Sequence, residues 1–92
     1  MAGELTGQLG KHLAVESRLD VMDRAMWQEH LALAERHVAE GRRLVARQRQ
    51  IVVDLGGVGY DTTTAQAVLA QFETTLMRHI EDRDRLKADL SR

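Results

Sequence analysis

The histidines are the residues of this chain whose type and spacing could support metal binding or proton-dependent chemistry. His30 and His37 are seven residues apart, so two helical turns bring them to one face of a helix. If the chain folds back on itself as argued below, His37 meets His79 from a second helix. A metal ion needs three or four ligands with supporting hydrogen bonds, and the only nearby carboxylate, Glu35, lies on a different face. We therefore expect no metal and no cofactor, and we interpret His37 and His79 as a pair that makes association pH-sensitive, because imidazole changes its charge between about pH 5 and 8.

The residues needed for catalysis are missing or badly placed. The chain has no cysteine, and its two serines, Ser17 and Ser91, lie near opposite ends. The glycines at 56, 57 and 59 resemble a phosphate-binding loop only in composition, because no lysine accompanies them and no strand precedes them. Aromatic residues make up 3% of the chain, too few for stacking on single-stranded nucleic acid. The sequence predicts that the protein is not an enzyme.

Arginine forms the other chemically notable cluster. Between residues 36 and 49 the only acidic residue is Glu40. The arginines of this segment are Arg36, Arg42, Arg43, Arg47 and Arg49. A basic helix can follow the phosphates of a nucleic acid, but the net charge of −1 supplies no attractive field, and these arginines spread over several angles of the helix. Nucleic-acid binding is therefore the alternative function, not the first.

Composition limits the class of protein. Ninety-two residues make one small domain, and small domains bury too little apolar surface to be comfortably stable alone, so self-association is expected. The chain is 43% hydrophobic and 29% charged, which is enough for a core. Without cysteine there is no disulfide framework, and the longest apolar runs are four residues long. We expect a soluble, cytoplasmic protein that does not enter the membrane.

The elements that position these side chains are two long helices. Residues 1–10 hold three glycines and little periodicity, which predicts a disordered N-terminal arm, and residues 11–92 then form the helical hairpin. Proline is absent, so nothing interrupts a first helix over about 11–55. Its apolar positions recur at three and four residues, as in a coiled-coil heptad. This seam consists of Leu31, Ala34, Val38, Gly41, Val45, Gln48, Val52 and Leu55. An earlier apolar stripe, from Val15 to Met26, is slightly rotated from the seam, which allows a bend or break near Trp27.

A turn over residues 56–61 should reverse the chain. Gly56 and Gly57 follow the last apolar seam position, where glycine can adopt the left-handed conformation that caps a helix. One of the residues from Asp61 to Thr64 then offers a side-chain oxygen to the first N–H groups of a second helix over about 62–91, with Tyr60 placed to pack back against it. The second seam is strictly regular. It consists of Ala65, Leu69, Phe72, Leu76, His79, Arg83, Leu86 and Leu90.

Pairing the two seams gives the predicted fold: an all-α, antiparallel two-helix hairpin, or coiled coil, with an N-terminal helical extension. Gly41 faces Leu76 in this register, which lets the helices approach closely. The second helix ends opposite Trp27, so residues 11–26 extend past it with an apolar stripe of their own. Either a second protomer covers this stripe or the segment folds back as a third helix. A dimeric helical bundle is favoured, because it would also bury apolar strips beside both seams. The residues predicted to mediate self-association are Val15, Leu19, Met22, Met26, Trp27, Leu44, Ile51, Met77 and Ile80.

Five segments form a recurring pattern: His30 to Gly41, Ala46 to Arg49, Tyr60 to Thr62, Phe72 to Leu76 and Asp82 to Leu86. In these segments the chain resembles short, functionally uncharacterised helical-hairpin proteins of soil alphaproteobacteria. The resemblance implies a bacterial source and the hairpin fold, and it implies no catalytic residue. The predicted function is that of a non-enzymatic, self-associating coiled-coil protein, a structural or adaptor module for protein–protein interaction. Its expected partners are a second copy of the chain and an unidentified protein.

Overall fold

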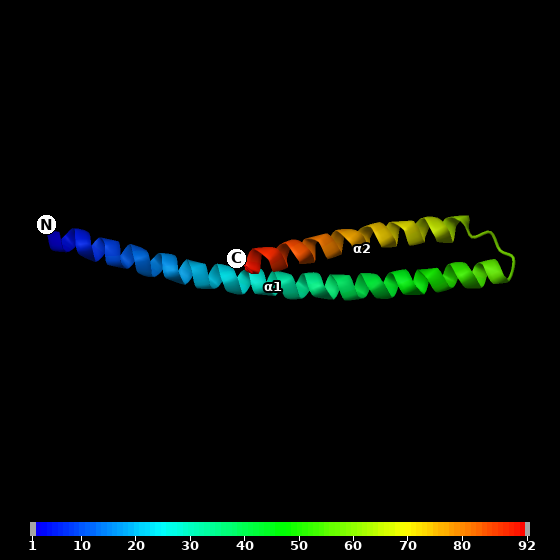
Figure 1. Ribbon diagram of the computed structural model, residues 1–92, viewed down its shortest axis with the longest axis horizontal. Coiled ribbons are helices and arrows are strands. Elements are labelled where there is room, and N and C mark those ends of the chain that lie inside the picture. Colours follow the sequence, from blue (N-terminus) through cyan, green and yellow to red (C-terminus); the bar gives the residue numbers. More distant parts are fainter. Residues whose placement is uncertain (1, 92) are drawn as a thin grey trace.

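The protein is a long rod made of two helices packed side by side. The computed structural model describes the backbone of residues 2–91 and the side chains of residues 23–91. Helix α1 spans Ala2–Gly57, and helix α2 spans Thr63–Leu90. The second helix runs back along the C-terminal half of the first, so the molecule measures 86 × 16 × 15 Å (Figure 1). The predicted all-α antiparallel hairpin is confirmed.

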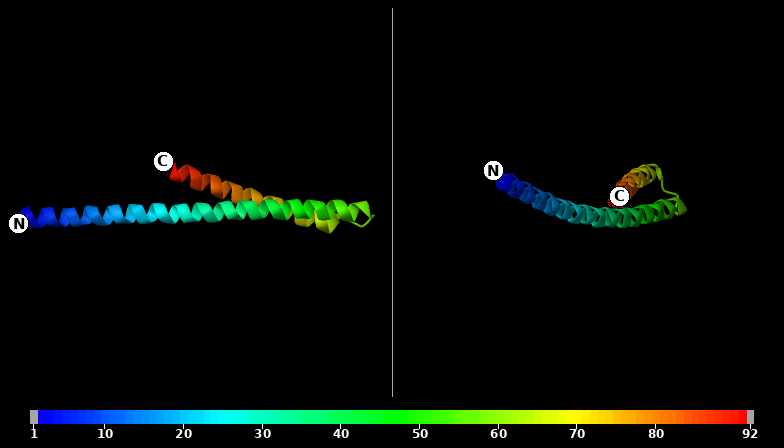
Figure 2. Two further views of the ribbon diagram at one scale, coloured as in Figure 1. Left: turned by 90° about the horizontal axis from the view of Figure 1, so that it is seen from below. Right: turned by 60° about the vertical axis from the view of Figure 1, so that its left-hand side comes forward.

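Helix α1 is longer and more continuous than the sequence indicates. It begins at Ala2 and passes through Trp27 as one gently curved helix (Figure 2). Residues 2–10 therefore belong to a helix where the sequence predicts a disordered arm, and between residues 2 and 57 there is neither the break that the sequence allows near Trp27 nor a fold-back into a third helix. Each glycine in a helix costs about 1 kcal/mol but removes no backbone hydrogen bond, and without proline the helix has no obligatory end. We call residues 2–26, which extend beyond α2, the overhang.

The predicted seams hold the two helices together. Among the described side chains of α1, the buried and half-buried positions are the eight seam residues, and Val38 is the most deeply buried at 2% exposure. All eight predicted positions of α2 are half-buried. The two helices pack side by side along the length of α2 (Figure 1). Seen from below, α2 crosses α1 obliquely (Figure 2, left). The apolar contact is one strip wide, because a pair of helices can bury only one stripe of each.

Two contacts fix the register of the hairpin. A Cβ atom placed on Gly41 would lie 3.1 Å from Cδ1 of Leu76, so the predicted close approach at this layer is confirmed. Gln48 is buried in the seam, and its Nε2 donates a hydrogen bond of 2.9 Å to the carbonyl oxygen of Ala65. A buried amide that must find a partner favours one register over its neighbours.

The turn closes α1 with a Schellman motif. The N–H of Tyr60 donates to the carbonyl of Leu55 (3.0 Å), and the N–H of Gly59 donates to the carbonyl of Gly56 (3.1 Å). Gly59 carries the positive φ of 83° that this motif requires. The left-handed residue is therefore Gly59, and the expectation that Gly56 or Gly57 takes this role is wrong: the helix continues through Gly57.

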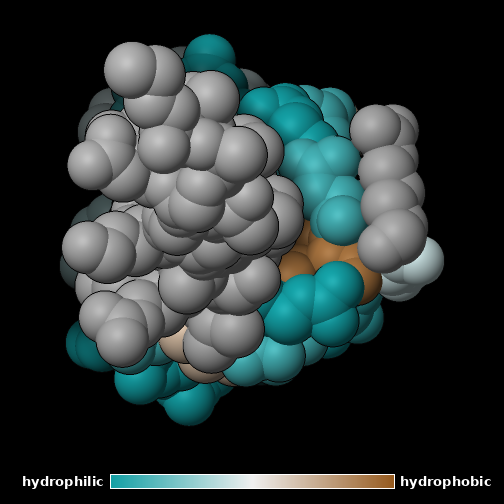
Figure 3. All heavy atoms as spheres, turned by 90° about the vertical axis from the view of Figure 1, so that its left-hand side faces the viewer, coloured by the Kyte–Doolittle hydropathy of each residue, from teal (hydrophilic) through white to brown (hydrophobic). Residues whose placement is uncertain are grey.

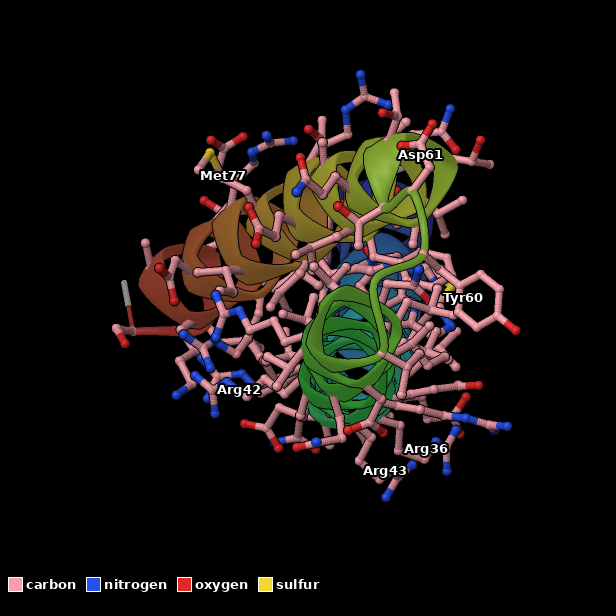
Figure 4. The ribbon with its side chains drawn as sticks, turned by 90° about the vertical axis from the view of Figure 1, so that its right-hand side faces the viewer. Arg36, Arg42, Arg43, Tyr60, Asp61 and Met77 are labelled. Atoms are coloured by element: carbon pink, nitrogen blue, oxygen red, sulfur yellow. The ribbon has the colours of Figure 1, made fainter. Side chains whose placement is uncertain are left out.

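Asp61, within the run of residues 61–64 predicted to supply a capping oxygen, meets the start of the second helix, although the N-cap position itself is Thr62, which makes no side-chain capping bond. The Oδ1 of Asp61 accepts hydrogen bonds from the backbone N–H of Thr63 (2.9 Å) and from the Thr63 hydroxyl (2.6 Å). These bonds, the hydroxyl first and the backbone second, lower the pKa of Asp61 below its ordinary value of 3.8. Tyr60 does not pack back, because its side chain is 68% exposed and projects from the turn (Figure 4).

Candidate protein interaction surface

The hairpin has two unlike flanks, one on each side of the buried seam. On the first, Arg49 pairs with Glu73 at 3.5 Å and Lys87 pairs with Glu35 at 4.0 Å, both from helix to helix. Ile80 lies seven residues from Glu73 and from Lys87, and therefore on the same side of α2. We call this side the ion-pair flank. Its charges are exposed, so the pairs add little stability.

The opposite side carries the histidines and an open groove, and we call it the histidine flank. The groove, of about 390 Å³, runs between the two helices near the end of α2. Its lining residues are Trp27, His30, Leu33, Ala34, His37, His79, Asp82, Arg85, Leu86 and Asp89. A smaller groove continues from it along the same flank, past Leu44, Phe72 and Thr75. Figure 3 shows hydrophobic side chains reaching the surface between hydrophilic ones when the rod is viewed from the overhang.

The predicted histidine pair forms. The ring centroids of His37 and His79 lie 4.9 Å apart, with the ring planes tilted by 43°. His37 is exposed and His79 is half-buried, so the pair connects the seam to the groove. In the described part of the chain, no three histidine, aspartate or glutamate side chains gather closely enough to hold a metal ion.

Apolar side chains are exposed along α1 on the histidine flank. Met26 is 49% exposed, Leu33 44%, Leu44 41% and Ile51 37%. Trp27 is also exposed, and its ring meets that of His30 edge to face, with centroids 6.0 Å apart. Of the other predicted association residues, the side chains of Val15, Leu19 and Met22 lie outside the described residues. Leu33 was not among the predicted residues, although its spacing of seven from Met26 signals it.

The two apolar strips expected to be buried together lie on opposite flanks. His30, His37 and Leu44 line the grooves of the histidine flank, and Ile51 follows Leu44 by seven residues on the same face of α1. Met77 lies on the other side of the rod, the side on which Arg42 also projects (Figure 4), and is exposed, while Ile80 is half-buried. One flank-to-flank contact cannot cover both strips, so the expectation that a single dimer interface buries them is wrong. Residue spacing locates a strip on its own helix, but the flank depends on how the helices face each other.

The arginine cluster covers the outer surface of α1. All five arginines are exposed, and Arg49 is held by its ion pair with Glu73. Figure 4 shows Arg42 projecting on the side of Met77, whereas Arg36 and Arg43 project together on the outer side of α1, away from α2. The cluster is therefore split between directions, as its spacing predicts.

These features define a class of protein: an antiparallel two-helix coiled coil with a long helical overhang and an exposed apolar flank. No protein-family model, no curated protein and no solved structure matches the chain. Within the part of the chain that the structure describes, neither helix carries an apolar stretch long enough to cross a lipid bilayer.

Proposed function

We propose that the protein is a non-enzymatic, self-associating coiled-coil module that acts as a structural or adaptor element. The observation that carries this proposal is the apolar surface exposed along the histidine flank by Met26, Trp27, Leu33, Leu44 and Ile51. Contiguous exposed apolar side chains beside a groove mark a protein-binding surface, whereas isolated ones do not.

The total surface area also supports association. The chain exposes 7535 Å², whereas a compact monomer of its 10.4 kDa mass exposes about 5,400 Å². The excess is comparable to the area that one subunit buries in an obligate dimer. A rod with this much uncovered surface gains stability by burying part of it against another protein.

Light scattering across micromolar protein concentrations tests the proposal, because it reads mass independently of the elongated shape. We expect a mass of at least two chains for the full protein. Leu44→Glu should weaken association at least about tenfold, because a charge would be buried in the interface. Val53→Glu, an exposed apolar residue outside the histidine flank, is the matched control and should change nothing. A monomer at all concentrations contradicts the proposal.

Removal of residues 1–26 is a companion test. We expect the shortened hairpin to stay helical, because its seam lies entirely within residues 31–90, and to lose association or solubility. If circular dichroism and mass are both unchanged, the overhang is only a tail.

The exposed arginine cluster supports a second candidate function, binding to nucleic acid. Phosphate contacts release counterions, so such binding should weaken steeply between about 50 and 200 mM salt. Fluorescence anisotropy with a labelled duplex tests it, with Arg36→Gln/Arg43→Gln as the variant. Absence of binding at low salt eliminates this candidate.

A further inference from the structure

We infer that the partner on the histidine flank is a second copy of this chain, docked antiparallel, so that the overhang of each copy lies against the hairpin of the other. This inference rests on the proposed self-association and specifies its geometry. Each end of such a dimer is a three-helix bundle, made of α1 and α2 from one copy and the overhang from the other.

The period of the apolar positions is the first argument. On α1 the exposed stripe runs through Met26, His30, Leu33, His37, Leu44 and Ile51. In the other direction the sequence continues it through Met22, Leu19 and Val15. From residue 15 to residue 51 its spacing averages about 3.6 residues per turn, the period of a straight helix, whereas the seam follows the 3.5 period of a supercoil. The overhang and the hairpin therefore share one continuous stripe, along which a second helix can lie.

Charge selects the direction of that helix. The arginine cluster occupies the C-terminal half of α1, whereas acidic residues outnumber basic ones in residues 2–29. The acidic residues there are Glu4, Glu16, Asp20, Asp23 and Glu29, and the basic ones are Lys11, Arg18 and Arg24. With residue 2 of one copy at the level of residue 57 of the other, antiparallel docking places Arg36 at the level of the partner's Asp23 and Arg43 at the level of the partner's Glu16. Parallel docking would place the two arginine clusters side by side, and like charges repel. Asp23 and Arg36 are both exposed in the single chain.

The area available favours the same arrangement. When two antiparallel α1 helices overlap along their whole length, residue 2 of one lies opposite residue 57 of the other. The midpoint then falls near His30, beside the groove of about 390 Å³. The overhang, which has no neighbour in the isolated chain (Figure 1), then covers the groove and the stripe of its partner. A twofold axis makes the same contact twice, as in most dimers.

Cysteine crosslinking tests this geometry, because the chain has no native cysteine. In the antiparallel dimer His30 lies near the partner's His30, whereas Ile51 lies about 60 Å from the partner's Ile51 along the rod. We therefore expect His30→Cys to form covalent dimers with a short bismaleimide and Ile51→Cys to stay uncrosslinked. Circular dichroism and light scattering of both variants verify that they fold and associate.

The outcomes separate the geometry from the proposed function. Covalent dimers of Ile51→Cys, or none from His30→Cys in a protein that still associates, overturn the antiparallel arrangement and leave self-association standing. A protein that is monomeric throughout overturns both.

Charge reversal gives a second, independent readout. Arg36→Glu/Arg43→Glu should weaken the dimer about tenfold or more, and so should Glu16→Arg/Asp23→Arg, because attractive pairs become repulsive on both sides of the axis. A chain carrying all four changes should recover, since the pairs are restored with opposite sign. Arg42→Glu, an exposed arginine of the same cluster that projects on the opposite side, is the control and should have no effect (Figure 4). A parallel dimer, in which each residue faces itself, would not be weakened by either double reversal.

Discussion

At the scale of single residues, Asp61 makes the stability of the turn depend on pH. Its pKa is lowered in the folded chain because the Thr63 hydroxyl and backbone N–H donate to its carboxylate. The unfolded chain thus binds this proton more tightly, so the stabilisation is complete above pH 3.8 and is lost as the pH falls through the lowered folded value.

We accordingly expect Asp61→Ala to lower the urea midpoint at neutral pH, and the two proteins to converge as the pH falls below the lowered folded pKa of Asp61. Asp61→Asn keeps an N-terminal cap that does not titrate, and its difference from alanine should persist in acid. All three are compared by circular dichroism at one protein concentration. A constant gap between parent and alanine variant from neutral pH to acid would rule out this linkage.

Alanine substitutions at Gly59 and Gly57 should change the stability of the hairpin in opposite directions. Gly59 has a positive φ, and a side chain there costs about 1–2 kcal/mol, so Gly59→Ala should destabilise the hairpin by about 1 kcal/mol. Gly57 ends α1, and a Cβ there would meet nothing within 4 Å. Gly57→Ala should therefore stabilise by up to about 1 kcal/mol through helix propensity. Thermal unfolding of both variants checks the prediction, and equal shifts would refute the assignment of the left-handed residue.

These residues also show what the local sequence determines. A capping oxygen within residues 61–64 could be predicted, because a helix cap depends on a few consecutive residues. The local sequence could not predict which of the three glycines takes the left-handed conformation. Helix α1 can end at several points with nearly equal local energy, and the packing of α2 selects among them. Tyr60 was predicted to pack back for a similar local reason, but the turn directs it into solvent.

At the scale of the helices, Gly41 tests the closest layer of the hairpin. Leu76 is half-buried against it, so a large side chain at 41 must push the helices apart, and Gly41→Leu should destabilise by about 1–3 kcal/mol. Gly41→Ala should be nearly neutral, since its gain in helix propensity offsets the tight contact at 3.1 Å.

Ala39→Leu, on the exposed face of the same turn, is the matched control and should shift the urea midpoint little. If the two leucine variants unfold alike, the close packing at Gly41 does not limit stability.

The pairing of the two helices could be predicted because a close approach, such as the one at Gly41, is possible in only one register. Both seams are regular, and only one antiparallel register places Gly41 against Leu76 and Gln48 near the start of α2. The two flanks were less predictable. Residue spacing places a strip of exposed residues on one helix, whereas the flank on which that strip lies depends on how both helices are rotated about their axes. Ile80 and Leu44 therefore ended on opposite sides despite matching apolar patterns.

At the scale of the whole molecule, the elongated shape of the chain is the main support for the proposed association. Its radius of gyration is 23.7 Å, about twice the roughly 12 Å of a compact domain of this length. The overhang accounts for much of this extension (Figure 1), and its length matches the hairpin that it would cover in a second copy.

The histidine pair should make the association of such a molecule respond to pH. His37 and His79, whose ring centroids are 4.9 Å apart, line both grooves of the flank on which we propose that the partner docks. When both are protonated, two like charges repel each other and must lose water as the partner arrives. The carboxylates of Glu40 and Asp82 partly offset this repulsion, and Arg85 adds to it.

We expect the dissociation constant from light scattering to rise about three- to tenfold between pH 7.5 and 5.5, a change of roughly 1 kcal/mol. His37→Gln keeps a polar side chain of similar reach without the titrating charge, so most of this dependence should disappear in that variant. His12→Gln, a histidine distant in sequence from the pair, should retain it. If the parent associates equally at both pH values, or if His37→Gln shows the full dependence, the pair does not control docking, because its charge would then be irrelevant to the contact.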